Sequence, residues 1–191
     1  MTTLVHGEVA RGLKVVLRQK RLGDAVNDYR WRTAADLSRY DAARPLTTTY
    51  QEFLAFYRED LLFPSAYRRS LAIEDLGGRH IGNVMYYNID SLRREAELGI
   101  TIGERQYWGA GYGADAVRLL VERLLHEQGY RRLHLKTLTW NERARRCFEK
   151  VGFIECGRAD RGGNDFVLME LLNDREAPGD DAQVRPFPAI P

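Results

Sequence analysis

A run of glycines between a strand pattern and an amphipathic helix pattern constrains this chain more than any other feature. Residues 95–103 read as a strand, and residues 108–113 read Trp-Gly-Ala-Gly-Tyr-Gly. Apolar residues then recur at helical spacing from Val117 to Leu125, which predicts a helix with one buried face over residues 112–128. Glycines bring bare backbone N–H groups close to a ligand, and a helix N-terminus favours negative charge. The segment therefore predicts a site for a phosphate or diphosphate.

Two common nucleotide motifs do not fit this segment. Residues 111–116 match the dinucleotide pattern with alanine as the third small residue, but that pattern needs an acidic residue at the end of the next strand. The next strand pattern, residues 132–138, contains no Asp or Glu. No Gly-Lys-Ser or Gly-Lys-Thr follows the glycines, so a P-loop is excluded. A plain glycine-rich loop is the remaining alternative, and the strongly amphipathic helix that follows argues against it.

The remaining patterns predict an α+β fold with a mixed, mostly antiparallel sheet flanked by helices. Strands are predicted over residues 13–17, 70–74, 80–89, 95–103, 132–138, 153–156 and 165–172, and helices over residues 24–32, 49–62, 112–128 and 141–151. Residues 34–45 read as irregular. A right-handed crossover across residues 95–138 implies one locally parallel strand pair. We expect a single domain over residues 1–172 and a mobile tail, rich in Asp and Pro, over residues 173–191.

Composition narrows the partners and the setting. The formal net charge is only +2 and is spread along the chain, so nothing points to a nucleic acid. No stretch approaches the roughly 18 apolar residues that a membrane span needs. The two cysteines, Cys147 and Cys156, match no disulfide framework or metal site, and the four histidines show no ligand spacing. We therefore expect no metal and no membrane partner, and a reducing, cytoplasmic setting.

Two motifs make the chain resemble the GNAT N-acetyltransferase superfamily over residues 12–172. The first, Gln/Arg-x-x-Gly-x-Gly/Ala, is matched at Gly111 and Gly113, with Trp108 at its polar position. The second, Asn-x-x-Ala-x-x-x-Tyr-Glu-Lys-x-Gly-Phe, is matched from Asn141 to Phe153. The chain is most similar to the branch that contains the ribosomal-protein N-terminal acetyltransferases and the polyamine acetyltransferases.

The resemblance implies acetyl-CoA as co-substrate and a sheet that splays between strands 95–103 and 132–138. The pantetheine arm would lie in the splay and bond the backbone of Ile100, Thr101 and Ile102. Asn141 would lie near the same arm, although its residue type equally fits a helix N-cap. The pyrophosphate would take N–H groups from the loop, which comprises Trp108, Gly109, Ala110, Gly111, Tyr112 and Gly113.

The implied chemistry is direct attack of a neutral amine on the thioester. Glu95 and Glu97 fall on one face of the strand at residues 95–103 and are the candidate bases, and the alternative is a pair of exposed strand charges. N–H groups near Ile102 would stabilise the oxyanion. Phenylalanine occupies the position of the family's proton-donating tyrosine, at Phe148, so water or Tyr112 would have to replace it. We expect Cys147 to point elsewhere on its helix.

Other polar residues are weaker candidates. Arg30, Trp31, Arg32 and Tyr40 fall where the substrate-side helices of the family would lie, and Trp31 is a candidate cleft residue. Three arginines at 143, 145 and 146 are candidates for the 3′-phosphate of the coenzyme.

The sequence thus predicts an N-acetyltransferase that moves an acetyl group from acetyl-CoA to a primary amine. The acceptor would be a protein N-terminus or a small-molecule amine, and a homodimer is one option for its assembly. The alternative is a non-catalytic CoA-binding module that serves as a sensor or interaction domain.

Overall fold

The structure is a computed structural model that describes residues 7–173. One eight-stranded sheet runs in the order β1-β2-β3-β4-β5-β6-β8-β7. Its strands are β1 (Glu8–Arg11), β2 (Val15–Gln19), β3 (Arg68–Asp75), β4 (His80–Asp90), β5 (Glu95–Ile102), β6 (Arg132–Leu138), β7 (Ile154–Arg161) and β8 (Asn164–Leu172). The α-helices are α1 (Ala25–Thr33), α2 (Ala35–Tyr40), α3 (Tyr50–Leu62), α4 (Tyr112–Glu122) and α5 (Glu142–Glu149).

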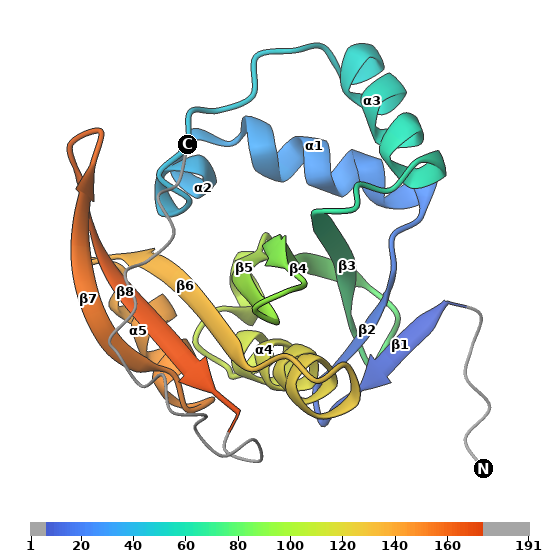
Figure 1. The fold of residues 1–191 in the computed structure, drawn as a ribbon. Helices are drawn as coiled ribbons and strands as arrows, with labels where there is room; N and C mark the ends of the chain where they lie inside the picture. Colours follow the sequence, from blue (N-terminus) through green and yellow to red (C-terminus); the bar gives the residue numbers. More distant parts are fainter. Residues whose placement is uncertain (1–6, 174–191) are drawn as a thin grey trace.

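The helices cover the sheet in two layers (Figure 1). α4 and α5 lie against one face, and α1, α2 and α3 lie against the other. Neighbouring strands are antiparallel except β5 and β6, which are parallel. The predicted mixed, mostly antiparallel α+β sheet with one parallel pair is therefore confirmed.

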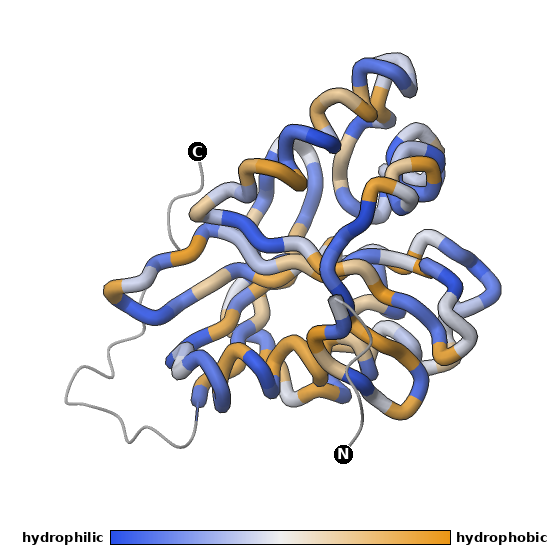
Figure 2. The backbone as a smooth tube through the Cα atoms, turned by 90° about the vertical axis from the view of Figure 1, so that its right-hand side faces the viewer, coloured by the Kyte–Doolittle hydropathy of each residue, from blue (hydrophilic) through white to orange (hydrophobic). Residues whose placement is uncertain are grey.

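The main hydrophobic core lies between the sheet and α4. The predicted stripe from Val117 to Leu125 is buried, and it packs with strand residues such as Ile73 and Leu135. Hydrophobic segments gather on the strands and on the helix beneath them (Figure 2). After Glu122 the helix continues as a wider π-type turn over Arg123–Glu127, and Gly129 at φ +70° ends it.

Two elements were missed by the sequence patterns. Residues 35–40 form α2, where we expected irregular chain, because Leu37 and Ser38 are buried against the rest of the domain. Residues 8–11 form β1, a short edge strand that pairs with β2 and has little apolar pattern of its own. Both are stabilised by contacts with distant segments rather than by local signals.

The predicted tail begins one residue too early. Asn173 is buried, and its side-chain amide donates to the backbone oxygens of Leu125 at 2.9 Å and Tyr130 at 3.0 Å. The rest of the predicted tail, residues 174–191, lies outside the described residues. Within residues 7–173, no helix is long and apolar enough to cross a membrane.

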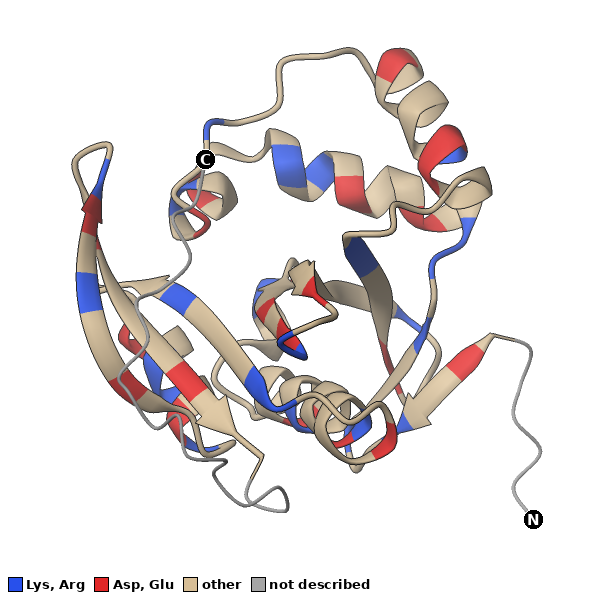
Figure 3. Cartoon of the chain, viewed as in Figure 1, with Lys and Arg blue, Asp and Glu red and all other residues tan. Residues whose placement is uncertain are grey.

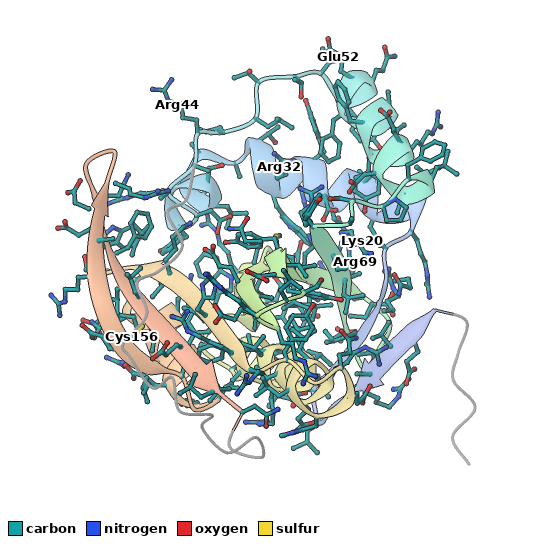
Figure 4. The ribbon with its side chains drawn as sticks, viewed as in Figure 1. Lys20, Arg32, Arg44, Glu52, Arg69 and Cys156 are labelled. Carbon is teal, nitrogen blue, oxygen red and sulfur yellow. The ribbon has the colours of Figure 1, made fainter. Side chains whose placement is uncertain are left out.

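A buried polar layer joins the second face of the sheet to α1, which carries both acidic and basic side chains (Figure 3). Arg18 contacts both carboxylate oxygens of Asp24 at 2.7 Å and Glu74 at 2.5 Å. Lys20 extends from beyond β2 toward α1 and pairs with Asp28 at 2.5 Å (Figure 4). These contacts fix α1 over the sheet.

His80 completes this layer and should make stability depend on pH. His80 is 7% exposed, and its Nε2 lies 3.1 Å from Asn83 Oδ1. Burial lowers the pKa of His80, and the positive charge of Lys20 lowers it further. A histidine with a lowered folded pKa binds fewer protons in the folded state, so stability falls as pH drops below about 6.5.

The measurement is thermal unfolding of the wild type and His80→Gln from about pH 8 to about pH 5. We expect the wild type to lose stability relative to His80→Gln as the pH falls through this range. A constant difference between the two proteins at every pH would contradict the assignment.

Candidate active site

The sheet opens between β5 and β6. The two strands pair over only three positions, from Glu95↔Arg132 to Glu97↔His134. Beyond these, β5 stays with β4 as far as Ile102↔Gly82, and β6 stays with β8 as far as Leu138↔Phe166. A cavity of about 770 Å³ lies at this opening, with walls from α2, β4, β5, β6, α5, β8 and the loop before α4. Its size is typical of a ligand site.

The backbone of β5 offers alternate residues to the opening. Gly103 N donates to Ile81 O at 2.9 Å, and opposite residues of an antiparallel pair alternate between bonded and non-bonded. The backbone N–H and C=O of Thr101 are therefore hydrogen-bonded to Asn83 of β4. The backbone groups of Ile100 and Ile102 point away from β4. The expectation that Thr101 offers its backbone to a pantetheine arm needs revision. The carbonyl of Ile102 accepts the indole N–H of Trp108 at 2.7 Å. The backbone N–H of Ile102 therefore remains for a ligand in the opening.

The glycine loop opens α4 as the sequence predicts. Gly111 is the N-cap at φ +88°, and the first backbone bond of the helix runs from Asp115 N to Gly111 O at 3.0 Å. The N–H groups of the turn before Asp115 have no partner within the helix. The Asp115 carboxylate is not free to repel an anion at these N–H groups, because it accepts the backbone N–H groups of Lys14 and Val15 at 2.8 and 3.1 Å.

Not every loop residue borders the cavity. Trp108, Gly109, Gly111 and Gly113 line it, while Ala110 and Tyr112 are outside the lining. The Tyr112 ring packs edge-on against Tyr107 at 4.8 Å between centroids. The structure therefore does not bring Tyr112 to the position of the missing tyrosine.

α5 supplies the opposite wall. Asn141 is the N-cap of α5, accepts the N–H of Ala144 at 3.3 Å and also lines the cavity, so its N-cap position is observed and its place near the pantetheine arm stays a prediction. Phe148 and Cys147 line the cavity as well. The expectation that Cys147 points elsewhere was wrong, because the face of α5 that packs toward α4 and Gly113 includes it. Burial raises the pKa of Cys147 to about 11, which keeps it a thiol and disfavours covalent catalysis.

The two predicted glutamates are engaged in ion pairs. Glu97 is 1% exposed and accepts Tyr87 Oη at 2.8 Å, Asn88 Nδ2 at 2.9 Å and Lys136 Nζ at 3.1 Å. Glu95 pairs with Arg132 at 3.2 Å. Neither glutamate is an exposed strand charge, and neither lines the cavity. Two partners of Glu97, Tyr87 and Lys136, do line it.

Asp41, which the sequence patterns did not single out, faces the cavity from the end of α2. Its carboxylate lies 3.4 Å from Thr101 Oγ1. Asp41 is exposed as a residue, yet the protein around its carboxylate desolvates it enough to raise its pKa to about 6. The only signal in the sequence was an acidic residue in a segment read as irregular.

Aromatic and cationic side chains meet at the edge of the cavity. The Arg143 guanidinium lies 3.6 Å from the Trp108 ring centroid and 4.8 Å from that of Tyr40. Tyr40 therefore lies at the cavity, whereas Trp31 does not. Trp31 is buried against Gly103, where a Cβ atom would overlap its ring.

Among residues 7–173, no three His, Cys, Asp or Glu side chains are arranged to hold a metal ion. Cys156 lies on the outer strand β7 (Figure 4).

A family model, the acetyltransferase (GNAT) domain, matches residues 14–154. The chain belongs to the GNAT acetyltransferase family. A relative of this GNAT chain is the protein YdaF of Bacillus subtilis (strain 168), named as a ribosomal N-acetyltransferase. The two are 31% identical over 101 residues, which are 50% of this chain and 55% of YdaF. The chain thus matches about half the length of this curated relative.

Solved structures share the GNAT fold. The spermidine N-acetyltransferase of Vibrio cholerae was solved in complex with CoA and spermine. Its TM-score with this chain is 0.73 at 20% identity, and the match covers 83% of this chain and 95% of that enzyme's chain. The aminoglycoside acetyltransferase AAC(6′)-Ib, solved with coenzyme A, has a TM-score of 0.69 at 23% identity, covering 83% and 94%.

Proposed function

We propose that the protein is an acetyl-CoA-dependent N-acetyltransferase that acetylates a primary amine. The observation that carries this proposal is the opening between β5 and β6, which lies beside the N-terminus of α4. An extended arm and a diphosphate can therefore be held side by side. Family membership and the coenzyme in two relatives of the same fold support the co-substrate.

The residues around the opening fit acetyl-CoA. The N–H groups of Ile100 and Ile102 and the side chain of Asn141 would hold the pantetheine arm. The N–H groups at the start of α4 would hold the diphosphate. Arg143, Arg146 and Lys150 on the α5 wall add positive charge for the phosphates.

The reaction requires little of the protein beyond placement. The amine nitrogen bonds to the thioester carbon, the C–S bond breaks, and an N–H group of Ile100 or Ile102 stabilises the oxyanion. Phe148 cannot donate a proton, but a thiol with a pKa of about 8.5 leaves well as a thiolate. The nitrogen loses one proton as the amide forms and the departing thiolate takes up one, so a neutral amine gives the amide and the free thiol with no proton left over.

The test has two steps. Calorimetric titration should show binding of acetyl-CoA and none of NADH. Thiol release should then appear with at least one amine from a panel of a peptide with a free N-terminus, spermidine and kanamycin, which represent the acceptors named for the relatives. Binding without thiol release from any primary amine would instead favour the non-catalytic module.

We also propose the cellular compartment and the acceptor. The two free cysteines favour a reducing, cytoplasmic compartment. The acceptor in that compartment would be a protein N-terminus or a small amine, and the coenzyme would come from the soluble pool.

A further inference from the structure

We propose that Asp41 binds the acceptor's ammonium group and takes its proton, and that the acceptor is a primary amine with one positive charge on an apolar or aromatic stem. This inference rests on the proposed acetyltransferase function. Asp41 is the C-cap of α2, and the acceptor class follows from the side chains that line the cavity beside it.

The position of Asp41 suits an acceptor-side carboxylate. It borders the cavity from α2, on the face of the sheet opposite α4 and α5. Its partner Thr101 lies on β5, between the two residues whose backbone groups face the opening. An amine held by Asp41 would therefore approach β5 from the side opposite the α5 wall.

The other carboxylates near the cavity are already engaged. Glu97 accepts two hydrogen bonds, from Tyr87 and Asn88, and pairs with Lys136. Glu142 lies on the α5 wall and pairs with Arg146 at 2.7 Å. Glu104 holds Arg30, Arg79 and the Trp31 indole outside the cavity lining. Among the described residues, Asp41 accepts a hydrogen bond only from the Thr101 hydroxyl and feels the charge of Arg32 without pairing with it, so it is the carboxylate that remains for an incoming cation.

The surrounding wall limits the acceptor to one charge. The cavity that Asp41 borders is also lined by apolar and aromatic side chains, among them Leu37, Tyr40, Met85, Tyr87 and Phe166. The same cavity is lined by four cationic side chains, Lys136, Arg143, Arg146 and Lys150. A polycation would place its further charges near these cations without a second free carboxylate to pair with. A monoamine places its charge on Asp41 and its stem on the rings.

The proton balance assigns Asp41 one transfer. The acceptor arrives as R–NH₃⁺ and must lose two protons to become R–NH–acetyl. Asp41 accepts the first and passes it to solvent, and the second neutralises the departing thiolate. The charged and titratable groups that interact with Asp41 are Arg32 from α1 and Tyr87 from β4, and Lys136 from β6 lines the same cavity. None of these has an ordinary pKa near 6, so an acid limb in that range reports Asp41.

The experiment compares the wild type, Asp41→Asn, Asp41→Glu and the control Asp36→Asn. Asp36 is on the same helix but pairs with Arg105 and does not line the cavity. The acceptors are 2-phenylethylamine as a monoamine and spermidine and kanamycin as polycations. For each protein we measure the Kd for acetyl-CoA, the kcat/KM of thiol release and its pH profile.

We expect wild-type kcat/KM for 2-phenylethylamine to exceed those for the polycations by about tenfold or more. Asp41→Asn should bind acetyl-CoA normally, lose about 10²-fold in kcat/KM and lose the acid limb near pH 6. Asp41→Glu should recover part of the rate, and Asp36→Asn should match the wild type.

The outcomes separate the two proposals. If the wild type binds acetyl-CoA but acetylates no amine, the proposed function is overturned and this inference falls with it. If the wild type acetylates an amine and Asp41→Asn does so equally well with the same acid limb, only the role of Asp41 is overturned. A preference for spermidine or kanamycin would overturn the acceptor class.

Discussion

Gly113→Leu is expected to abolish acetyl-CoA binding while the domain stays folded. Gly113 lies in the first turn of α4 with an ordinary negative φ, so the backbone accepts other residues. Its Cβ position points between Cys147, Ile100 and Ile102, at 3.4 to 3.8 Å, toward the opening between the strands. A leucine side chain there would occupy the space beside the N–H groups that should hold the diphosphate.

The expected size of this effect follows from the bonds it removes. Hydrogen bonds to a charged group are worth about 1.5–3 kcal/mol each, so losing two weakens binding by more than about 100-fold. Calorimetric titration with acetyl-CoA measures the loss. Gly113→Ala is the matched control, because its single methyl meets only ordinary van der Waals contacts and alanine favours the helix. Equal affinity in Gly113→Leu and the wild type would mean that the coenzyme binds elsewhere.

Arg18→Met is expected to cost about 3–5 kcal/mol of the free energy of unfolding. Arg18 is 3% exposed, and its guanidinium neutralises both Asp24, which is 4% exposed, and Glu74. Methionine fills much of the volume but leaves buried Asp24 without its arginine and Glu74 with only the more distant Arg21, 3.8 Å away. Since about 1 kcal/mol moves the melting temperature of a domain of this size by about 2–4 °C, we expect a fall of roughly 10 °C.

Thermal or urea unfolding measures this difference. The control is Arg68→Met, which removes a pair with Asp60 in which both side chains are 53% exposed, and it should change stability by less than about 1 kcal/mol. Adding Asp24→Asn and Glu74→Gln to Arg18→Met should recover part of the loss, because no unpaired charge then stays buried. If Arg18→Met and Arg68→Met cost the same, the layer does not act as a buried ion network.

The sequence by itself determined the elements with strong local signals. The stripe on α4, the glycine loop and the cap of α5 at Asn141 each depend on residues a few positions apart, and each appears where the pattern predicts it. The parallel pair of β5 and β6 followed from the handedness of one crossover. These features carry the resemblance to the family and the prediction of where the coenzyme binds.

Only the tertiary structure decided which acidic residue is free to act. Glu97 looked like a base on its strand, but Tyr87, Asn88 and Lys136, from other parts of the sheet, saturate its carboxylate. Asp41 looked like part of a loop, and it meets Thr101, 60 residues away, only because α2 folds onto the domain. A helix of six residues is too short to be stable alone, so its existence depends on burial that no local pattern records. The chemistry of a carboxylate depends on its neighbours in space, and folding brings those neighbours from distant parts of the chain.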